Sequence, residues 1–436
     1  MSDSLSFNKA QWVLPDVDLG LIEKVARSFD LPEVIARMLL QRDITPDDIP
    51  SFLNPTLKNN MPDPFSMKDM DGLADAMASA IEDKKNIAIF GDFDVDGATS
   101  SALLYRFLKH CGIEASIYIP ARLTEGYGPN VPALEKLKEQ GAEIVFLLDC
   151  GTTAFDVVEA GAQMGLEIII LDHHEAEEKL PNACFVVNPK RKDDEAGLGV
   201  LAAVGVTFMA CVAINAKLRE AGFFENNGIE QAPLMSWLDI VALGTVCDMV
   251  PLTGVNRLLV RQGFKVMQNS GNVGLNALIE VSRISGALSP YHAGFVLGPR
   301  INAGSRVHKS DLGAKLLSTD DPQEANDIAW TLNDCNDKRK AIQSEMEREA
   351  LATVEAQGLD QHPLIFVASE NFHQGLSGLV AGRLKEKYGT PACVVALVEN
   401  EKGVLEGRGS GRSVPGVHIA QAFIDARNEE IIEKGG

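Results

Sequence analysis

Short apolar runs alternate with helical patterns over the first half of the chain. The runs NIAIF (86–90), EIVFLL (143–148) and LEIIIL (166–171) predict buried strands, and IEASIYI (113–119) predicts a further one. The segments between these runs repeat apolar residues with the spacing of a helix. This alternation predicts an α/β fold built on a doubly wound parallel sheet, with helices covering both of its faces.

Helical patterns flank this region and suggest a division of the chain. We expect a helical N-terminal lead-in at 1–70, a main domain at 71–320, a single charged connector helix at 321–358 and a second, smaller α/β domain at 359–436. The uncharged stretch AGLGVLAAVGVTFMACVAINA (196–216) is as long as a membrane span, but its glycines and polar residues favour a buried helix.

Composition and charge narrow the classes of function. Hydrophobic residues at 45% and charged residues at 23% are ordinary for a globular chain, and 436 residues suggest two or three domains. A net charge of −21 argues against broad adhesion to nucleic acid or anionic membranes, but it is compatible with a local basic surface. Seven scattered cysteines without a CxxC pair, and an amino terminus without an export pattern, indicate a cytoplasmic protein with no membrane partner.

The stretch GDFDVDGATS (91–100) places three aspartates at alternate positions after a predicted strand. Asp92, Asp94 and Asp96 match ligand positions of an EF-hand loop, but Leu103 stands where the bidentate glutamate belongs. DVDGAT also resembles the DxDGT stretch of haloacid-dehalogenase-like phosphatases, and the sequence has no GxxxxGK[ST] for a P-loop. A solvated turn at a helix start explains one aspartate better than three, because crowded carboxylates repel unless cations hold them.

Further carboxylates and imidazoles follow other predicted strands. Asp149 in LLDCGTTA follows one run, and LDHHE places Asp172, His173 and His174 after the next. The carboxyl ends of strands in a doubly wound sheet share one edge, where ligands bind. Asp248 ends the apolar helix pattern of WLDIVALGTVCDMVPL and is a fourth candidate. Many oxygen donors, one or two imidazoles and no thiolate motif suit Mn²⁺ or Mg²⁺ better than structural zinc.

The order GDFDVDGATS, LDCGTTA, LDHHE and ALGTVCDMVPL resembles the four motifs of the DHH phosphoesterase superfamily, and within it the RecJ-type single-strand-specific 5′→3′ DNA exonucleases. The likeness covers nearly the whole chain, because it extends to SFLNP (51–55), YIPARLTEGYG (118–128), LGPRINAGSR (297–306), GLVAGRL (378–384) and GSGRSVPG (409–416). It implies a DHH domain joined by a long helix to a DHHA1-like domain. Ser305 stands where the family usually has glycine, and the family's following GGH…AAG segment and oligonucleotide-binding barrel are expected to be missing by truncation.

The resemblance implies roles for the candidate metal ligands. Two divalent cations, Mn²⁺ or Mg²⁺, would be held by Asp94, Asp96, Asp149, His173 and Asp248. Asp149 would bridge the two cations, and Asp92 would bind one either directly or from the outer shell. His174 would face the scissile phosphate, while Asp172 would orient His173.

The resemblance also implies how the substrate is bound. A pocket for a 5′-terminal phosphate is expected at Arg122, Ser410 and Arg412, because guanidinium groups and a glycine-rich backbone suit an anion. Tyr127 would stack on a base, and Arg306 and Arg383 would contact backbone phosphates.

The implied activity is hydrolysis of single-stranded DNA from the 5′ end in repair and recombination, with a helicase and a single-strand-binding protein as potential partners. Two alternatives stay open: a DHH phosphoesterase acting on nanoRNA, nucleotides or pyrophosphate, and a non-catalytic replication scaffold. Every ligand position that the motifs supply is occupied in this sequence, which argues against the scaffold.

Overall fold

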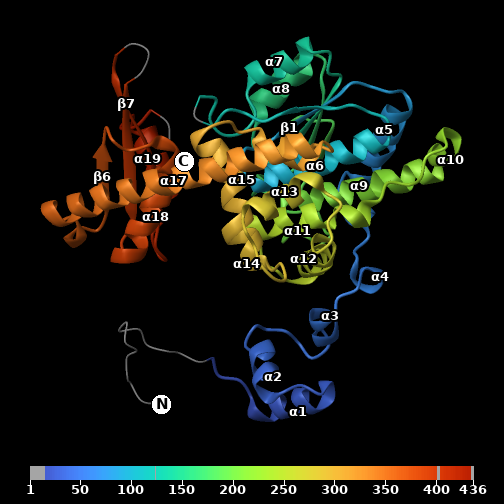
Figure 1. Cartoon of the computed structure of the whole chain (residues 1–436), viewed down its shortest axis with the longest axis horizontal. Helices are drawn as coiled ribbons and strands as arrows, with labels where there is room; N and C mark the ends of the chain where they lie inside the picture. The colour runs from blue at the N-terminus through green and yellow to red at the C-terminus, as the bar shows by residue number, and fades with distance from the viewer. Residues whose placement is uncertain (1–14, 123, 400–402, 434–436) are drawn as a thin grey trace.

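The structure is a computed structural model that describes residues 15–122, 124–399 and 403–433 (Figure 1). The predicted lead-in at 1–70 and the predicted C-terminal domain at 359–436 therefore each include residues outside the described ranges. Four short helices come first, and Figure 1 shows the earliest of them projecting from the rest of the molecule: α1 Leu19–Phe29, α2 Glu33–Leu40, α3 Ile49–Leu53 and α4 Leu57–Asn60.

These N-terminal helices have a small core of their own, formed around Ile22, Val25 and Leu39. The end of α3 is held on α12 (Gly254–Met267), where the Arg257 guanidinium stacks on the Phe52 ring at 3.7 Å and donates to the Phe52 carbonyl. The SFLNP stretch therefore serves as a docking segment between the N-terminal helices and the main sheet region.

Five parallel strands form the large sheet in the order β2-β1-β3-β4-β5. Their bounds are β1 Ile87–Gly91, β2 Ser116–Tyr118, β3 Ile144–Leu148, β4 Glu167–Leu171 and β5 Phe185–Val187. One face packs on α5 (Met70–Glu82), α6 (Val95–His110) and α9 (Ala203–Glu220), and the other on α7 (Val131–Glu139) and α8 (Phe155–Gln163). The predicted doubly wound parallel sheet is confirmed. Strand β5 was not predicted, because three apolar residues are too short a run to indicate a strand.

The apolar stretch at 196–216 runs into α9, and most residues of this helix are buried between α5, α6 and α11. Among the described helices, none combines the length and the apolar character that crossing a bilayer requires. The predicted buried helix is confirmed for 203–216, and it begins at Ala203 instead of Ala196. All seven cysteines are free.

A layer of helices completes the large unit, which we define as residues 70–318, and a second apolar cluster forms between α6 and several of them. They are α10 Phe223–Asn227, η2 Leu234–Trp237, α11 Leu238–Cys247, α12, α13 Val273–Val281, α14 Pro290–His292, η3 Ala293–Leu297, α15 Gly298–Val307 and α16 Leu312–Ser318. Short η1 (Pro64–Ser66) precedes this unit.

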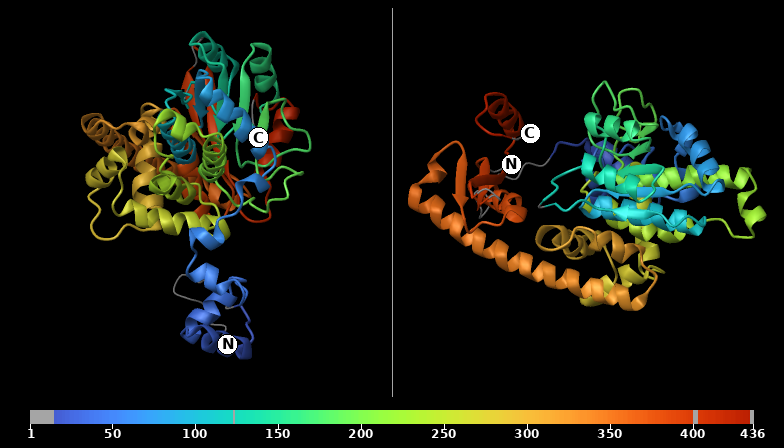
Figure 2. Two further views of the ribbon diagram at one scale, coloured as in Figure 1. Left: turned by 90° about the vertical axis from the view of Figure 1, so that its right-hand side faces the viewer. Right: turned by 90° about the horizontal axis from the view of Figure 1, so that it is seen from above.

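Helix α17 (Pro322–Gln357, 36 residues) links the large unit to a small unit, residues 359–433 (Figure 2). Its first half contributes Ile328 and Leu332 to a core of the large unit, and its second half contributes Met346 and Val354 to the core of the small unit. This agrees with a connector helix, while the bounds of the four predicted domains stay a prediction.

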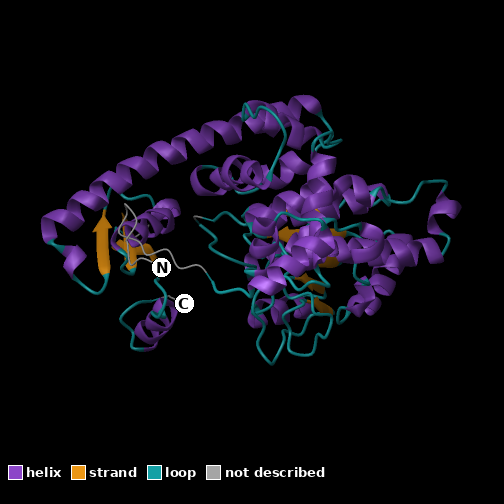
Figure 3. Ribbon diagram, turned by 90° about the horizontal axis from the view of Figure 1, so that it is seen from below, coloured by secondary structure: helices purple, strands orange, loops and turns teal. Residues whose placement is uncertain are grey.

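The small unit is built on a three-stranded sheet in the order β6-β7-β8, with β6 and β7 parallel and β8 antiparallel to β7. Figure 3 shows strands of this unit apart from those of the large sheet. Its elements are η4 Leu359–Gln361, β6 Ile365–Ser369, η5 Gln374–Leu376, α18 Ser377–Tyr388, β7 Ala392–Glu399, β8 Leu405–Arg412 and α19 Ile419–Asn428. The second, smaller α/β domain predicted from the sequence is therefore present.

Candidate metal centre and substrate-binding residues

Three strands of the large sheet end in the predicted site residues. Asp92 follows β1, Asp149 follows β3 and Asp172 follows β4, and the amide of each aspartate extends the ladder by donating to the neighbouring strand over 3.0–3.1 Å. The strand order reverses between β1 and β3, the position at which ligands bind in doubly wound folds. The sheet itself therefore brings carboxylates from separate segments to one edge.

Asp94 and Asp96 lie where α6 begins. Asp94 caps this helix by accepting from the amides of Asp96 (2.8 Å) and Gly97 (3.1 Å). Position 97 requires glycine, because a Cβ there would stand 2.3 Å from the Asp92 carbonyl oxygen. The buried carboxylate of Asp96 accepts from the Ala203 and Val204 amides, at 2.6 and 2.9 Å, at the start of α9. Two helix N-termini thus stabilise two of the carboxylates.

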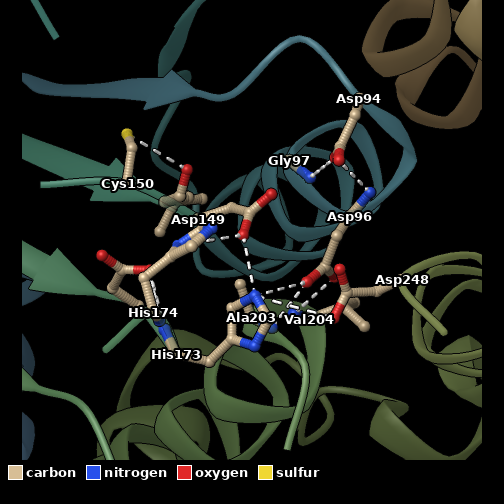
Figure 4. Close-up of polar contacts among 12 residues, drawn as sticks. Asp94, Asp96, Gly97, Asp149, Cys150, His173, His174, Ala203, Val204 and Asp248 are labelled. Carbon is tan, nitrogen blue, oxygen red and sulfur yellow. Dashed lines mark hydrogen bonds and ion pairs between the residues drawn. The ribbon is translucent and has the colours of Figure 1, made fainter. Parts of the chain in front are cut away.

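The ring of His173 lies among three carboxylates (Figure 4). Its Nε2 is 3.2 Å from Asp149 Oδ1, 3.6 Å from Asp248 Oδ2 and 3.8 Å from Asp96 Oδ2. Burial, and then the neighbouring His174, lowers the pKa of His173 to about 4, so the ring is neutral at pH 7 and these approaches are not ion pairs. A histidine must be neutral to bind a metal, so the His173 ring has the protonation state that a metal ligand needs.

The carboxylates of this cluster are held close together in a buried place. Burial, followed by repulsion from Asp94, raises the pKa of Asp92 and that of Asp248 to about 7. Burial and nearby carboxylates raise the pKa of Asp96 and of Asp149 well above the ordinary range. Without a cation these side chains repel one another, so the arrangement favours a bound positive charge.

Among the residues that the structure describes, three groups of side chains have ligand atoms within 4.8 Å of one another: Asp92, Asp94 and Asp149; Asp149, His173 and His174; Asp96, His173 and Asp248. Asp149 and His173 each belong to two of these groups, as adjacent cations with shared ligands would require. Buried atoms of the cluster also lack a hydrogen-bond partner, namely Asp92 Oδ1, Asp149 Oδ1, both ring nitrogens of His173 and Asp248 Oδ2. The donor set is one of oxygens and imidazole, which suits Mn²⁺ or Mg²⁺.

Asp172 holds the ring of His174 and not that of His173, which differs from our expectation. Its Oδ1 accepts from His174 Nδ1 at 2.7 Å and from the His173 and His174 amides at 2.7 and 3.2 Å. The chain bends at His174, and the Asp172 side chain reaches the ring two residues on. The hydrogen bond with Asp172 raises the pKa of His174, and this bond and one with Thr152 outweigh burial to lower the pKa of Asp172.

Residues that the sequence analysis did not single out support this pair. The Thr152 amide donates to Asp172 Oδ2 over 3.1 Å, and Asn188 Nδ2 donates to Thr152 Oγ1 and to the His174 carbonyl, each over 2.9 Å. Asn188 directly follows the short strand β5. A polar residue after the apolar run FVV is the sequence signal that could have indicated it as a site residue. Phe93, inside the aspartate motif, contacts the Tyr127 ring and the Arg122 guanidinium.

Arg122 and Tyr127 lie beside the carboxylates. The Arg122 guanidinium is 4.5 Å from the centre of the Phe93 ring, and Phe93 meets Tyr127 edge-on at 5.9 Å. Burial lowers the pKa of Arg122, although Asp92 and Asp94 oppose this shift. Tyr127 is 62% exposed, and its hydroxyl lies 3.2 Å from His174 Nε2.

The remaining arginines come from both units. Arg412 and Ser410 lie on β8, and Arg412 is close enough to Arg122 to affect its pKa. Burial, followed by Arg122 and Arg339, lowers the pKa of Arg306 to about 10. Arg383 is engaged elsewhere, because it pairs with Glu386 at 3.2 Å and approaches Glu347 at 3.9 Å. Arg122, Arg306 and Arg412 therefore form a cationic group next to the acidic cluster.

Comparison with known proteins agrees with this geometry. Residues 86–245 match the model of the DHH family, N-terminal domain. The chain is 32% identical to the single-stranded-DNA-specific exonuclease RecJ of Bacillus subtilis over 97% of this chain and 51% of that protein, and 33% identical to RecJ of Salmonella typhimurium over 90% of this chain and 68% of that protein. It spans about half to two thirds of the length of these relatives.

Solved structures give the same result. A crystal structure of RecJ from Thermus thermophilus in complex with Mn²⁺ is 26% identical, with a TM-score of 0.78 over 97% of this chain and 58% of that chain. A structure of exonuclease RecJ bound to manganese is 28% identical, with a TM-score of 0.70 over 83% of this chain and 86% of that chain. The fold, the cluster of carboxylates and imidazoles and these similarities together show that the chain belongs to the RecJ family.

Proposed function

We propose that this chain hydrolyses phosphodiester bonds of single-stranded DNA from the 5′ end, using two divalent cations, Mn²⁺ or Mg²⁺. The observation that carries the proposal is the convergence of Asp96, Asp149 and Asp248 on His173, with buried ligand atoms left unpaired, beside a group of arginines. The RecJ relatives and the manganese-bound RecJ structures support it.

The side chains that would hold the cations are Asp92, Asp94, Asp96, Asp149, His173 and Asp248. Bound in a pair, such cations lower the pKa of a water between them and neutralise charge on a phosphodiester. Asp149 is the best candidate for a shared ligand, since its carboxylate belongs to two of the three groups. This chain thus needs no protein nucleophile.

Asp172 and His174 have a different task. The short contact with Asp172 fixes the orientation of the His174 ring and favours its protonated form. The exposed side of His174 can then donate to a phosphate oxygen, and its Nε2 is the atom that now lies beside the Tyr127 hydroxyl. Tyr127 is exposed enough to stack on a base, a contact that tolerates any sequence.

Recognition of the 5′ end is assigned to Arg122, Ser410 and Arg412. A terminal phosphate carries more negative charge than an internal one, and guanidinium groups bind it through two parallel hydrogen bonds. Arg306 and Arg383 are assigned to backbone phosphates, and Arg306 lies near Arg122. A helicase and a single-strand-binding protein are proposed partners in repair and recombination, and the cytoplasm is the proposed location.

The test is a length ladder with 5′-labelled and 3′-labelled single-stranded oligonucleotides and Mn²⁺, with duplex DNA, dinucleotides of RNA and pyrophosphate alongside. We expect mononucleotides released from the 5′ end of single strands and little attack on duplex. Efficient hydrolysis of RNA dinucleotides or pyrophosphate with inert DNA would favour the alternative DHH phosphoesterase function. Binding of single strands without hydrolysis of any substrate would favour a scaffold.

A further inference from the structure

The large and small units touch directly as well as through α17. In α15, Arg306 Nη1 donates to the carbonyl of Gly375 in η5 over 3.0 Å. The two backbones are also close, because a Cβ on Gly375 would stand 2.7 Å from the Arg306 carbonyl oxygen. Segments of different units therefore meet at a place with no room for a side chain.

Both partners in this contact are fixed within their own units. Ile301 of α15 is buried in the core of the large unit, and Leu376, next to Gly375, is fully buried in the core of the small unit. The His373 ring accepts from the Gly375 amide over 3.2 Å and so holds the turn. A displacement at Gly375 would consequently move the whole small unit and not just a loop.

The contact lies next to the residues assigned to the 5′-phosphate. Helix α18 begins at Ser377, and a Cβ on Gly378 would be 2.7 Å from Arg412 Nη2 and 3.4 Å from Ser410 Cβ. Arg412 and Ser410 thus rest on the first turn of the helix that starts just after Gly375. Their position relative to the acidic cluster depends on how η5 is seated on α15.

Helix α17 alone would fix this position poorly. It has 36 residues, and at 1.5 Å per residue it is about 54 Å long, so a bend of about 5° at one end would displace the other end by about 5 Å. Long helices bend by such amounts readily. A second point of contact close to Arg412 removes most of that freedom.

We propose that Gly375 is a positioning residue whose contact with Arg306 sets the distance from the metal centre to Ser410 and Arg412, and thereby which phosphodiester from the 5′ end is hydrolysed. The inference rests on the proposed function and deepens it. Gly375 does not have a positive φ, so alanine fits its own backbone conformation. Its Cβ would clash with the Arg306 carbonyl oxygen at 2.7 Å and would meet the His373 ring less closely, at 3.2 Å.

The first test measures the distance between the units without using activity. Spin labels on Cys184, an exposed native cysteine, and on Glu386→Cys, an exposed position in α18, report the distance between the large and small units. Gly375→Ala should displace or broaden the distance distribution. The matched control is Gly382→Ala, on the same helix α18, where a Cβ would meet nothing within 4 Å.

The second test uses 5′-phosphorylated oligonucleotides and bis(p-nitrophenyl) phosphate, a small diester that needs the metal centre alone. Gly375→Ala should lower kcat on oligonucleotides by about 10–100-fold, because a misplacement of about 1 Å has effects of this size, and should release dinucleotides besides mononucleotides. Hydrolysis of the small diester should stay within twofold of the parent chain. Stabilisation by Mn²⁺ should be unchanged.

The proposal would be overturned if Gly375→Ala had the same product lengths, kcat and distance distribution as Gly382→Ala. If Gly375→Ala does not fold, Arg306→Met, which keeps an apolar chain and loses the donor, should broaden the same distribution, and an unchanged distribution would overturn it. A parent chain that hydrolyses no oligonucleotide would contradict the proposed function instead, and the distance measurement would still decide whether the contact positions the small unit.

Discussion

Replacing Asp92 by asparagine should stabilise the metal-free protein above neutral pH and weaken its response to Mn²⁺. Asp92 is 2% exposed, and burial followed by repulsion from Asp94 raises its pKa from 3.8 to about 7. Each pKa unit is worth about 1.36 kcal/mol, so a shift of about three units corresponds to about 4 kcal/mol against the charged form. Asparagine has a similar shape and no charge, and would recover part of this free energy.

The pH dependence has a definite sign. The pKa of Asp92 is higher in the folded than in the unfolded state, so between about pH 4 and about pH 7 the folded protein binds more protons. Wild-type stability should therefore fall as the pH rises through this window, and the asparagine variant should lose less. Thermal unfolding in EDTA at pH 5 and pH 8 measures the difference, which should be larger at pH 8.

Adding Mn²⁺ should oppose this difference between the two proteins. A cation at 100 times its dissociation constant stabilises by about 2.7 kcal/mol, and the wild type should gain more than the variant because it has one more charged ligand. Glu178→Gln, at an exposed carboxylate of the same unit, is the control and should leave both responses unchanged. A variant that unfolds at a lower temperature in EDTA at both pH values would refute the repulsion argument, and an equal gain from Mn²⁺ would remove Asp92 from the ligands.

Three substitutions test the other assignments. Asp149→Ala should reduce turnover at saturating Mn²⁺ to below about a hundredth while the fold survives, because loss of a shared ligand removes more than the ~10–100-fold typical of an outer residue; turnover above that level would contradict its role. Asp172→Asn should fall within that milder range, since it loosens the His174 ring and leaves the ligands in place, and an effect as large as that of Asp149→Ala would make Asp172 a ligand. Arg412→Ala should lower the preference for 5′-phosphate over 5′-hydroxyl oligonucleotides by the ~1.5–3 kcal/mol of a charge-assisted contact, whereas an unchanged ratio would place the pocket elsewhere.

Much of the metal centre could be predicted because it depends on strand ends. Buried apolar runs located β1, β3 and β4, and the rule that parallel strands share a carboxyl edge brought Asp92, Asp149 and His173 together before any coordinates. Asp248 is different, because it ends a helix whose placement against the sheet is decided by tertiary packing. The local pattern made Asp248 a candidate, and the resemblance to a family put it among the ligands.

Other features depend on geometry that no short pattern contains. Which ring Asp172 holds is decided by the local backbone conformation, and the sequence LDHHE is equally compatible with either histidine. The contact of Gly375 with Arg306 joins residues from two units, and glycine in a short turn is too common to indicate a close approach. The support of Asp96 by the start of α9 likewise appears once the fold has placed that helix beside α6.

The position of the carboxylates explains how the fold can accommodate their repulsion. Asp149 and Met249, the residue after Asp248, both have φ of 61°, a left-handed conformation that is unfavourable for residues other than glycine. Asp92 and Asp149 follow β1 and β3, which lie inside the sheet with a strand on each side and buried side chains on both faces. Interior strands lose the most contacts when they move. The backbone strain and the repulsion between carboxylates therefore act on the part of the unit that resists displacement most. Cation binding should consequently raise the unfolding temperature of the large sheet as a whole, since the repulsion that it relieves acts on the strands at the centre of that sheet.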